Sequence, residues 1–124
     1  MRELLAITKA LADETRLRAV GLLRQHELCL CQIVEVLGLA SSSVSRHMSL
    51  LQQARLVESR KQGRWVYFRL AEDDDAPQLV HDALEMILAS LGSDKQAKAD
   101  QKFLKSVLKI EPEELCRQQS HCKC

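Results

Sequence analysis

The chain has 124 residues, five cysteines and a formal net charge of +1. Its length and its 46% hydrophobic content suit one small domain. The charged start, with Arg2 and Glu3, argues against a signal peptide, and no apolar run is long enough to span a membrane. We therefore expect a cytoplasmic protein without a membrane partner. In that compartment thiols stay reduced, so an odd number of cysteines favours ligands or sensors over a disulfide framework.

Positive charge is concentrated in one segment of this nearly neutral chain. Residues 41–69 hold six Arg and Lys residues and one acid, Glu58, and an acidic run over residues 72–75 follows directly. A basic segment of this kind favours a face that binds a polyanion such as nucleic acid.

Apolar residues at helical spacing predict two helices at the start of the chain, over residues 2–11 and 14–25. Asp13 is the predicted N-cap of the second helix. A third helix is predicted over residues 31–37. It stops at Gly38, which can adopt the left-handed conformation of a helix end.

The segment "SSSVSRHMSLLQQA" begins just after that glycine. Its apolar residues Val44, Met48 and Leu51 are four and three positions apart, so they fall on one face of a helix. A helix, a short turn containing glycine and a second helix have the spacing of a helix-turn-helix.

Two alternating segments, residues 56–60 and 65–70, flank Gly63 and predict a β-hairpin. This hairpin is a wing beside the helix-turn-helix, with Arg60, Lys61 and Arg64 at its tip. The expected fold is therefore mainly α with a small β-hairpin wing, a winged helix-turn-helix.

Pro77 can open a further helix, whose apolar stripe ends before Gly92. Such a stripe needs a partner. The N-terminal helix can cover part of it and a second subunit the rest, so we expect a homodimer. Residues 1–92 are predicted to form the DNA-binding and dimerisation domain. Residues 93–124 are predicted to form a polar extension with a cysteine-rich end and one short amphipathic patch.

The start of the fourth predicted helix is the candidate DNA contact. Its small hydroxyls and backbone N–H groups can approach phosphates and base edges in the major groove of operator DNA. The wing would add phosphate contacts. The candidate DNA-binding residues are Ser41, Ser42, Ser43, Ser45, Arg46 and His47 in the helix, and Lys61 and Arg64 in the wing.

Four separated motifs resemble, in order and spacing, those of the ArsR/SmtB family of bacterial winged-helix repressors, and the resemblance covers about residues 3 to 92. The motifs are "LADETRL" (11–17), "ELCLC" (27–31), "SSSVSRHMSLL" (41–51) and "RKQGRWVYFRL" (60–70). The resemblance implies a dimer that binds its operator when metal-free and dissociates when a metal or metalloid binds. Ala40 stands where the family commonly has a serine cap, so the cap is expected at Ser41.

"ELCLC" is similar to an element of arsenite sensors and of cadmium/lead sensors. The expected function is thus an arsenite- or antimonite-responsive repressor, with As(III) or Sb(III) as inducer and Cys29 and Cys31 as ligands. Thiolates select soft ions, and the positive end of a helix should lower the pKa of both thiols. Residues two apart on a regular helix diverge. One ion can therefore hold both sulfurs only where this turn is non-helical or unwinds on binding, which would distort the helix-turn-helix.

The chain departs from the arsenic-sensor pattern at two positions. Val34 stands where some members carry a third cysteine, and Gln32 stands where an aspartate is common. Since trivalent arsenic prefers three sulfurs, the third is expected from the C-terminal extension. The candidates are Cys122 and Cys124, ranked slightly above Cys116.

Several alternatives remain open. The extension could be unordered with reactive thiols, or His121 with the three C-terminal cysteines could hold zinc. The scaffold could instead sense Cd(II) or Pb(II), or act as a thiol redox switch through a disulfide to the extension. We expect neither an enzyme nor an organic cofactor, because the chain lacks a C-x-x-C motif, a phosphate loop and a believable catalytic triad.

Overall fold

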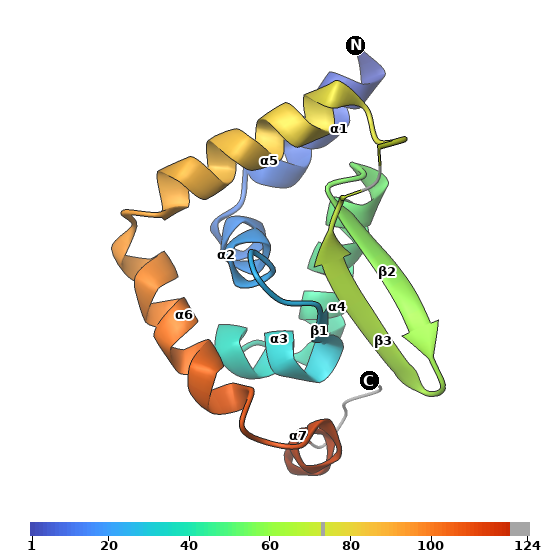
Figure 1. The fold of residues 1–124 in the computed structure, drawn as a ribbon. Helices are drawn as coiled ribbons and strands as arrows, with labels where there is room; N and C mark the ends of the chain where they lie inside the picture. Colours follow the sequence, from blue (N-terminus) through green and yellow to red (C-terminus); the bar gives the residue numbers. More distant parts are fainter. Residues whose placement is uncertain (73, 120–124) are drawn as a thin grey trace.

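A computed structural model describes residues 1–72 and 74–119 and has the predicted winged helix-turn-helix architecture (Figure 1). The helices are α1 (Arg2–Leu11), α2 (Glu14–Leu22), α3 (Leu30–Leu37), α4 (Ser41–Gln53), α5 (Gln78–Leu91), α6 (Lys95–Val107) and α7 (Pro112–Gln118). The strands are β1 (Leu28–Cys29), β2 (Val57–Gln62) and β3 (Trp65–Leu70). None of the described helices has the length and apolar character needed to cross a membrane.

The helix-turn-helix forms where the sequence predicts it. Gly38 ends α3 in the left-handed conformation with φ of 69°, and the apolar residues Val44, Met48 and Leu51 of α4 are fully buried. The predicted cap at Ser41 is wrong. Ala40, extended at φ −60° and ψ 144°, is the N-cap, and Ser41 is already the first helical residue.

The wing is a three-stranded antiparallel sheet in the order β1-β3-β2. Gly63 takes a φ of 62° in the hairpin turn, and Phe68 and Leu70 of β3 are buried. The sequence analysis did not predict β1. This strand pairs Leu28 with Phe68 and Cys29 with Tyr67, so the wing is hydrogen-bonded to the segment that carries the first cysteine.

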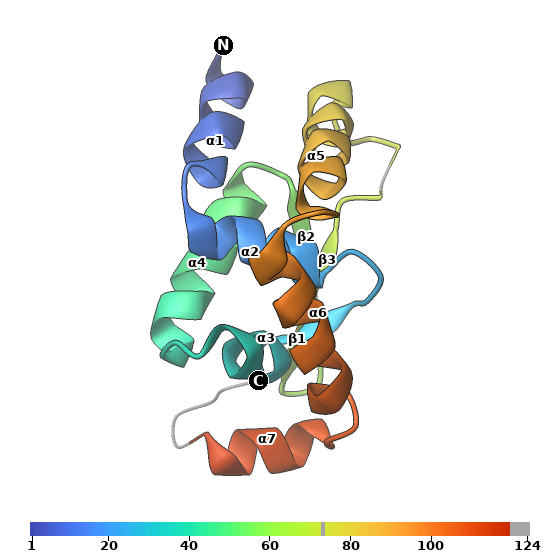
Figure 2. The same ribbon diagram turned by 90° about the vertical axis from the view of Figure 1, so that its left-hand side faces the viewer.

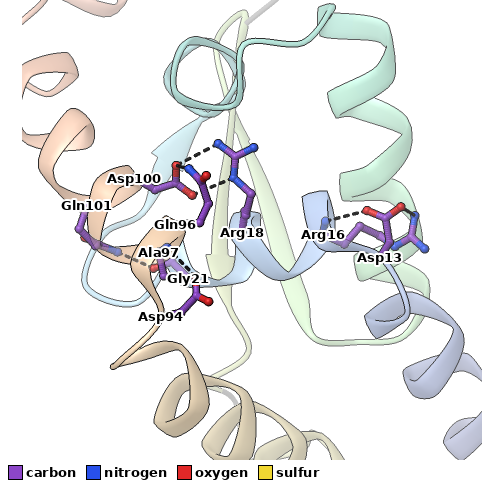
Figure 3. Close-up of polar contacts among 9 residues, drawn as sticks. All are labelled: Asp13, Arg16, Arg18, Gly21, Asp94, Gln96, Ala97, Asp100 and Gln101. Atoms are coloured by element: carbon purple, nitrogen blue, oxygen red, sulfur yellow. Dashed lines mark hydrogen bonds and ion pairs between the residues drawn. The ribbon is translucent and has the colours of Figure 1, made fainter.

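The described part of the extension packs on the core: α6 lies against α2 and α3, and α7 lies against α3 (Figure 2). The Arg18 guanidinium donates two hydrogen bonds of 2.9 Å to the buried carboxylate of Asp100 (Figure 3). Asp100 is on α6 and Arg18 on α2. The predicted amphipathic patch lies in α6, where Leu104 and Val107 are each 1% exposed. A domain division at residue 92 stays a prediction.

Helices α1 and α5 lie side by side at one end of the molecule in both views (Figures 1 and 2). Their outer surface exposes large apolar side chains, among them Leu4, Leu5, Leu79 and Met86. Exposed apolar residues gathered on neighbouring helices are typical of an interface. This surface is the one on which a homodimer is expected.

Candidate thiol site and nucleic-acid interface

Cys29 lies outside the helix that contains Cys31. It ends β1 and is the N-cap of α3, with φ −79° and ψ 162°, and its N–H donates to Oε1 of Gln32 over 2.9 Å. Gln32 thus completes a capping box, which gives a local role to the residue that departs from the arsenic-sensor pattern. The divergence expected of two residues on one regular helix does not apply to this pair.

The predicted lowering of the thiol pKa is wrong for Cys29. Burial raises the pKa of this thiol, and the N–H groups of Gln32, Cys31 and Cys29 itself lower it by less. Cys29 is fully buried and keeps a free thiol. A soft ion that binds here must displace the thiol proton, which a divalent cation releases to the solvent and a metalloid hydroxide takes up as water.

The structure joins Cys31 to Cys116 as a disulfide, although the two residues are 85 positions apart. Their Cα atoms lie 6.0 Å apart, a usual separation for bridged cysteines. This pairing differs from the expectation of reduced thiols. It also brings one candidate residue of the extension directly against the "ELCLC" element.

Helix α7 is held in this position by more than the sulfur atoms. Leu115 is fully buried beside Cys116. The Gln119 side-chain amide donates to the Cys31 carbonyl over 3.0 Å and to the Glu35 carboxylate over 2.9 Å. Helix α7 therefore docks on α3, through contacts at both Cys31 and Glu35.

The other candidate ligands of the extension, Cys122 and Cys124, lie outside the described residues, as does His121. Within residues 1–72 and 74–119, no group of three or more His, Cys, Asp or Glu side chains is arranged to hold a metal ion. The ranking of Cys122 and Cys124 above Cys116, and the zinc alternative, stay predictions.

The candidate DNA-binding residues of α4 differ in exposure. Ser42, Ser43, Ser45 and Arg46 are exposed, whereas Ser41 and His47 are half-buried. The His47 ring nitrogen Nδ1 lies 3.0 Å from Nη1 of Arg16. His47 therefore also links α4 to α2, a structural contact that its sequence position gave no reason to expect.

The wing residues carry different partners. Lys61 is exposed, and the Arg64 guanidinium covers the Trp65 ring at 4.9 Å while lying 3.5 Å from the Glu113 carboxylate of α7. Arg60 binds Glu27 at 2.6 Å, and its hydrogen bonds lower the pKa of that carboxyl despite partial burial. Arg60 thus anchors the wing. Lys61 is exposed to solvent, whereas Arg64 has to leave Glu113 to contact a phosphate.

Sequence reasoning missed the contacts that couple distant segments: Glu27 with Arg60, Arg18 with Asp100, and Arg64 with Glu113. Each joins two elements by side chains far apart in the chain, so no spacing rule identifies them. Of these residues, Glu27 alone was marked by a motif, since it is the first residue of "ELCLC".

Comparison with known proteins agrees with this architecture. The family described as "Bacterial regulatory protein, arsR family" matches residues 13–59. The arsenic resistance transcriptional regulator ArsR1 of Pseudomonas putida is 38% identical over 92 residues, which cover 71% of this chain and 70% of that protein. A homologue of the cadmium resistance regulatory protein CadC of Staphylococcus aureus is 33% identical over 89 residues, or 69% of this chain and 73% of that protein.

Among solved structures, reduced HlyU of Vibrio cholerae superposes with a TM-score of 0.60 at 27% identity, covering 75% of this chain and 92% of HlyU. The family match confirms the resemblance, and the similarity to HlyU confirms the predicted winged-helix fold. The family consists of transcription regulators rather than enzymes. This chain belongs to the ArsR family of DNA-binding bacterial transcription regulators.

Proposed function

We propose that the protein is a repressor that binds operator DNA as a metal-free homodimer and is released when arsenite or antimonite binds its cysteines. The observation that carries this proposal is the placement of Cys116 of α7 against Cys31 of α3, two residues beyond the buried thiol of Cys29. The Cys31 and Cys116 sulfurs are thus in contact, and Cys29 is close to them along the chain. The arsenic-resistance regulator among the relatives supports As(III) as the inducer.

Sulfur ligands select this class of inducer by their softness. In arsenous acid each bond from a thiol sulfur to arsenic replaces one bond to a hydroxyl group. The thiol proton leaves with that hydroxyl as water, so three thiols release three waters and no oxidant is needed. We assign Cys29, Cys31 and Cys116 as the ligand set, because Cys116 is the residue of the extension that the structure seats beside Cys31.

The position of these thiols supports a mechanism for release. Cys31 is in α3, which leads through Gly38 into the recognition helix α4, and Cys29 is in β1, which pairs with β3 of the wing. Closing the three sulfurs on one ion therefore pulls on both elements that contact DNA. In this account α4 supplies the base-edge contacts, Lys61 and Arg64 contact phosphates, and the exposed face of α1 and α5 forms the dimer interface.

A thiol redox switch is the second candidate, and the Cys31–Cys116 disulfide is the observation that favours it. In that case the two thiols lose two protons and two electrons to an oxidant such as a peroxide. The disulfide that links α3 to α7 then forms without any ion.

The cadmium-resistance relative keeps Cd(II) or Pb(II) as a third possibility on the same scaffold.

Two variants separate the candidate ligands of the extension. Cys116→Ser keeps α7 and its Leu115 contact, whereas truncation after Gln119 removes Cys122 and Cys124 and leaves α7 intact. We expect Cys116→Ser to raise the arsenite concentration for half-release by about 10- to 100-fold or more, since one ligand is lost. We expect the truncated protein to respond like the wild type.

The measurement is release of labelled operator duplex from reduced protein across an arsenite titration. The reverse pattern would transfer the third ligand to Cys122 or Cys124. An unchanged response in both variants would refute a ligand from the extension and leave the repressor assignment standing.

A further inference from the structure

Helix α6 carries a row of lysines along its exposed side. Intervals of three and four residues place them on one face of the helix, opposite its buried residues Leu104 and Val107. The single acid in this stretch, Asp100, is 4% exposed and bound to Arg18, so it does not interrupt the row. The exposed lysines are Lys95, Lys98, Lys102, Lys105 and, just beyond the helix, Lys109.

Part of this row borders a cleft. Lys98, Lys102 and Lys105 line one side of an open hollow of about 570 Å³, and Arg24, at the end of α2, lines the other. The Arg24 guanidinium donates to the Leu88 carbonyl, which fixes its position at the rim. None of the described residues that line the hollow is acidic. A basic cleft without carboxylates fits a phosphate-bearing polyanion.

The lysine row also differs from many arginines of the protein in forming no ion pair with a described carboxylate. Within residues 1–72 and 74–119, no ion pair involves any of the five lysines. Six arginines elsewhere do pair with carboxylates, namely Arg16, Arg18, Arg60, Arg64, Arg69 and Arg117. The five lysines therefore form a row of positive charge with no ion pair to a described carboxylate.

Helix α6, which carries the row, lies on the opposite side of α2 and α3 from α4 and the wing (Figure 1). A duplex seated on α4 and the wing cannot run straight onto α6. We propose that the lysine face of α6 is a second DNA-binding surface, which holds the phosphate backbone of a duplex segment other than the one bound by α4. A homodimer would present two such faces.

The chemistry of the face favours DNA over other polyanions. Lysine is a point charge suited to phosphate contacts that carry no sequence information. A family member bound at its operator is already held at high effective concentration near neighbouring DNA. Insertion into a membrane surface requires a continuous exposed apolar face, whereas Leu104 and Val107 of α6 are buried on the core and Phe103 and Leu108 are the exposed apolar residues of this stretch. From Lys95 to Lys109 the row spans roughly 20 Å, or about six base pairs, at the usual helical rise.

The test uses the full-length protein saturated with a short operator duplex, to which a labelled duplex of unrelated sequence is added at several salt concentrations. The variant is Lys98→Gln, Lys102→Gln and Lys105→Gln together, and the matched control replaces the same three lysines with arginine. We expect wild type and the arginine control to bind the second duplex. We expect the glutamine variant to bind at least about tenfold more weakly, with a log–log salt slope shallower by about 2 to 3.

Affinity for the short operator duplex should be the same in all three proteins, which also reports on their folding. Equal binding of the second duplex by wild type and the glutamine variant would overturn the proposal. The proposal would also be overturned if the wild-type protein did not bind the second duplex but did bind anionic vesicles or an acidic polypeptide. Arsenite plays no part in this test, so its result is independent of the proposed inducer.

Discussion

Replacing Cys31 with serine is expected to abolish release of the operator by arsenite while leaving operator binding intact. Cys31 connects both halves of the proposed site, since it lies in α3 of the helix-turn-helix and contacts Cys116 of α7. Serine preserves the size of this buried side chain but cannot supply a soft ligand. The apparent affinity for arsenite should therefore fall by more than about 100-fold, beyond the usual cost of losing an outer-shell partner.

The matched variant is Cys29→Ser, at the other cysteine of the motif. Under the three-thiol assignment it should lose arsenite-dependent release as well. A redox switch between Cys31 and Cys116 predicts a different pattern, in which Cys29→Ser still responds to peroxide and Cys31→Ser does not. Arsenite-dependent release by Cys31→Ser at the wild-type concentration would contradict the assignment of this residue.

Replacing Leu104 with alanine is expected to lower the free energy of unfolding by about 2 to 5 kcal/mol, as is usual for a fully buried leucine. Leu104 is on α6, beyond the predicted domain boundary, and is 1% exposed. The neighbouring residue Phe103 is 46% exposed and provides the control. Phe103→Ala should change stability by no more than about 0.5 kcal/mol, because it faces solvent.

Urea denaturation followed by circular dichroism measures both changes. An extension that is separate from the core would make the two substitutions equally mild. That result would refute the packing of α6 on α2 and α3, and with it the fixed position of the lysine row.

Local signals in the sequence predicted those parts of the fold that depend on local physics. Asp13 caps α2 by accepting the Arg16 N–H over 3.1 Å, and Gly38 and Gly63 take the positive φ values expected of them. The alternating residues of β3 bury Phe68 as predicted. Strand β1 was missed because two residues are too few to show a period.

Candidate site residues that share one sequence segment could be predicted from that segment. Contacts between two distant segments could not be predicted. The "ELCLC" motif located Cys29 and Cys31, but the burial that raises the pKa of Cys29 depends on packing by distant residues. The choice among C-terminal cysteines depended on where α7 docks, which Leu115 and Gln119 determine through contacts with α3. The Arg18–Asp100 pair that seats α6 joins residues 82 positions apart.

The most direct test of the proposed function is fluorescence anisotropy of the reduced protein on a labelled duplex from its own upstream region. Arsenite, cadmium and zinc are titrated in separately. The account predicts tight binding of the metal-free protein and release by micromolar arsenite, with little effect of zinc. Firm binding that ignores arsenite would contradict the proposed inducer, and release by cadmium alone would assign the protein to the divalent-ion sensors of its family.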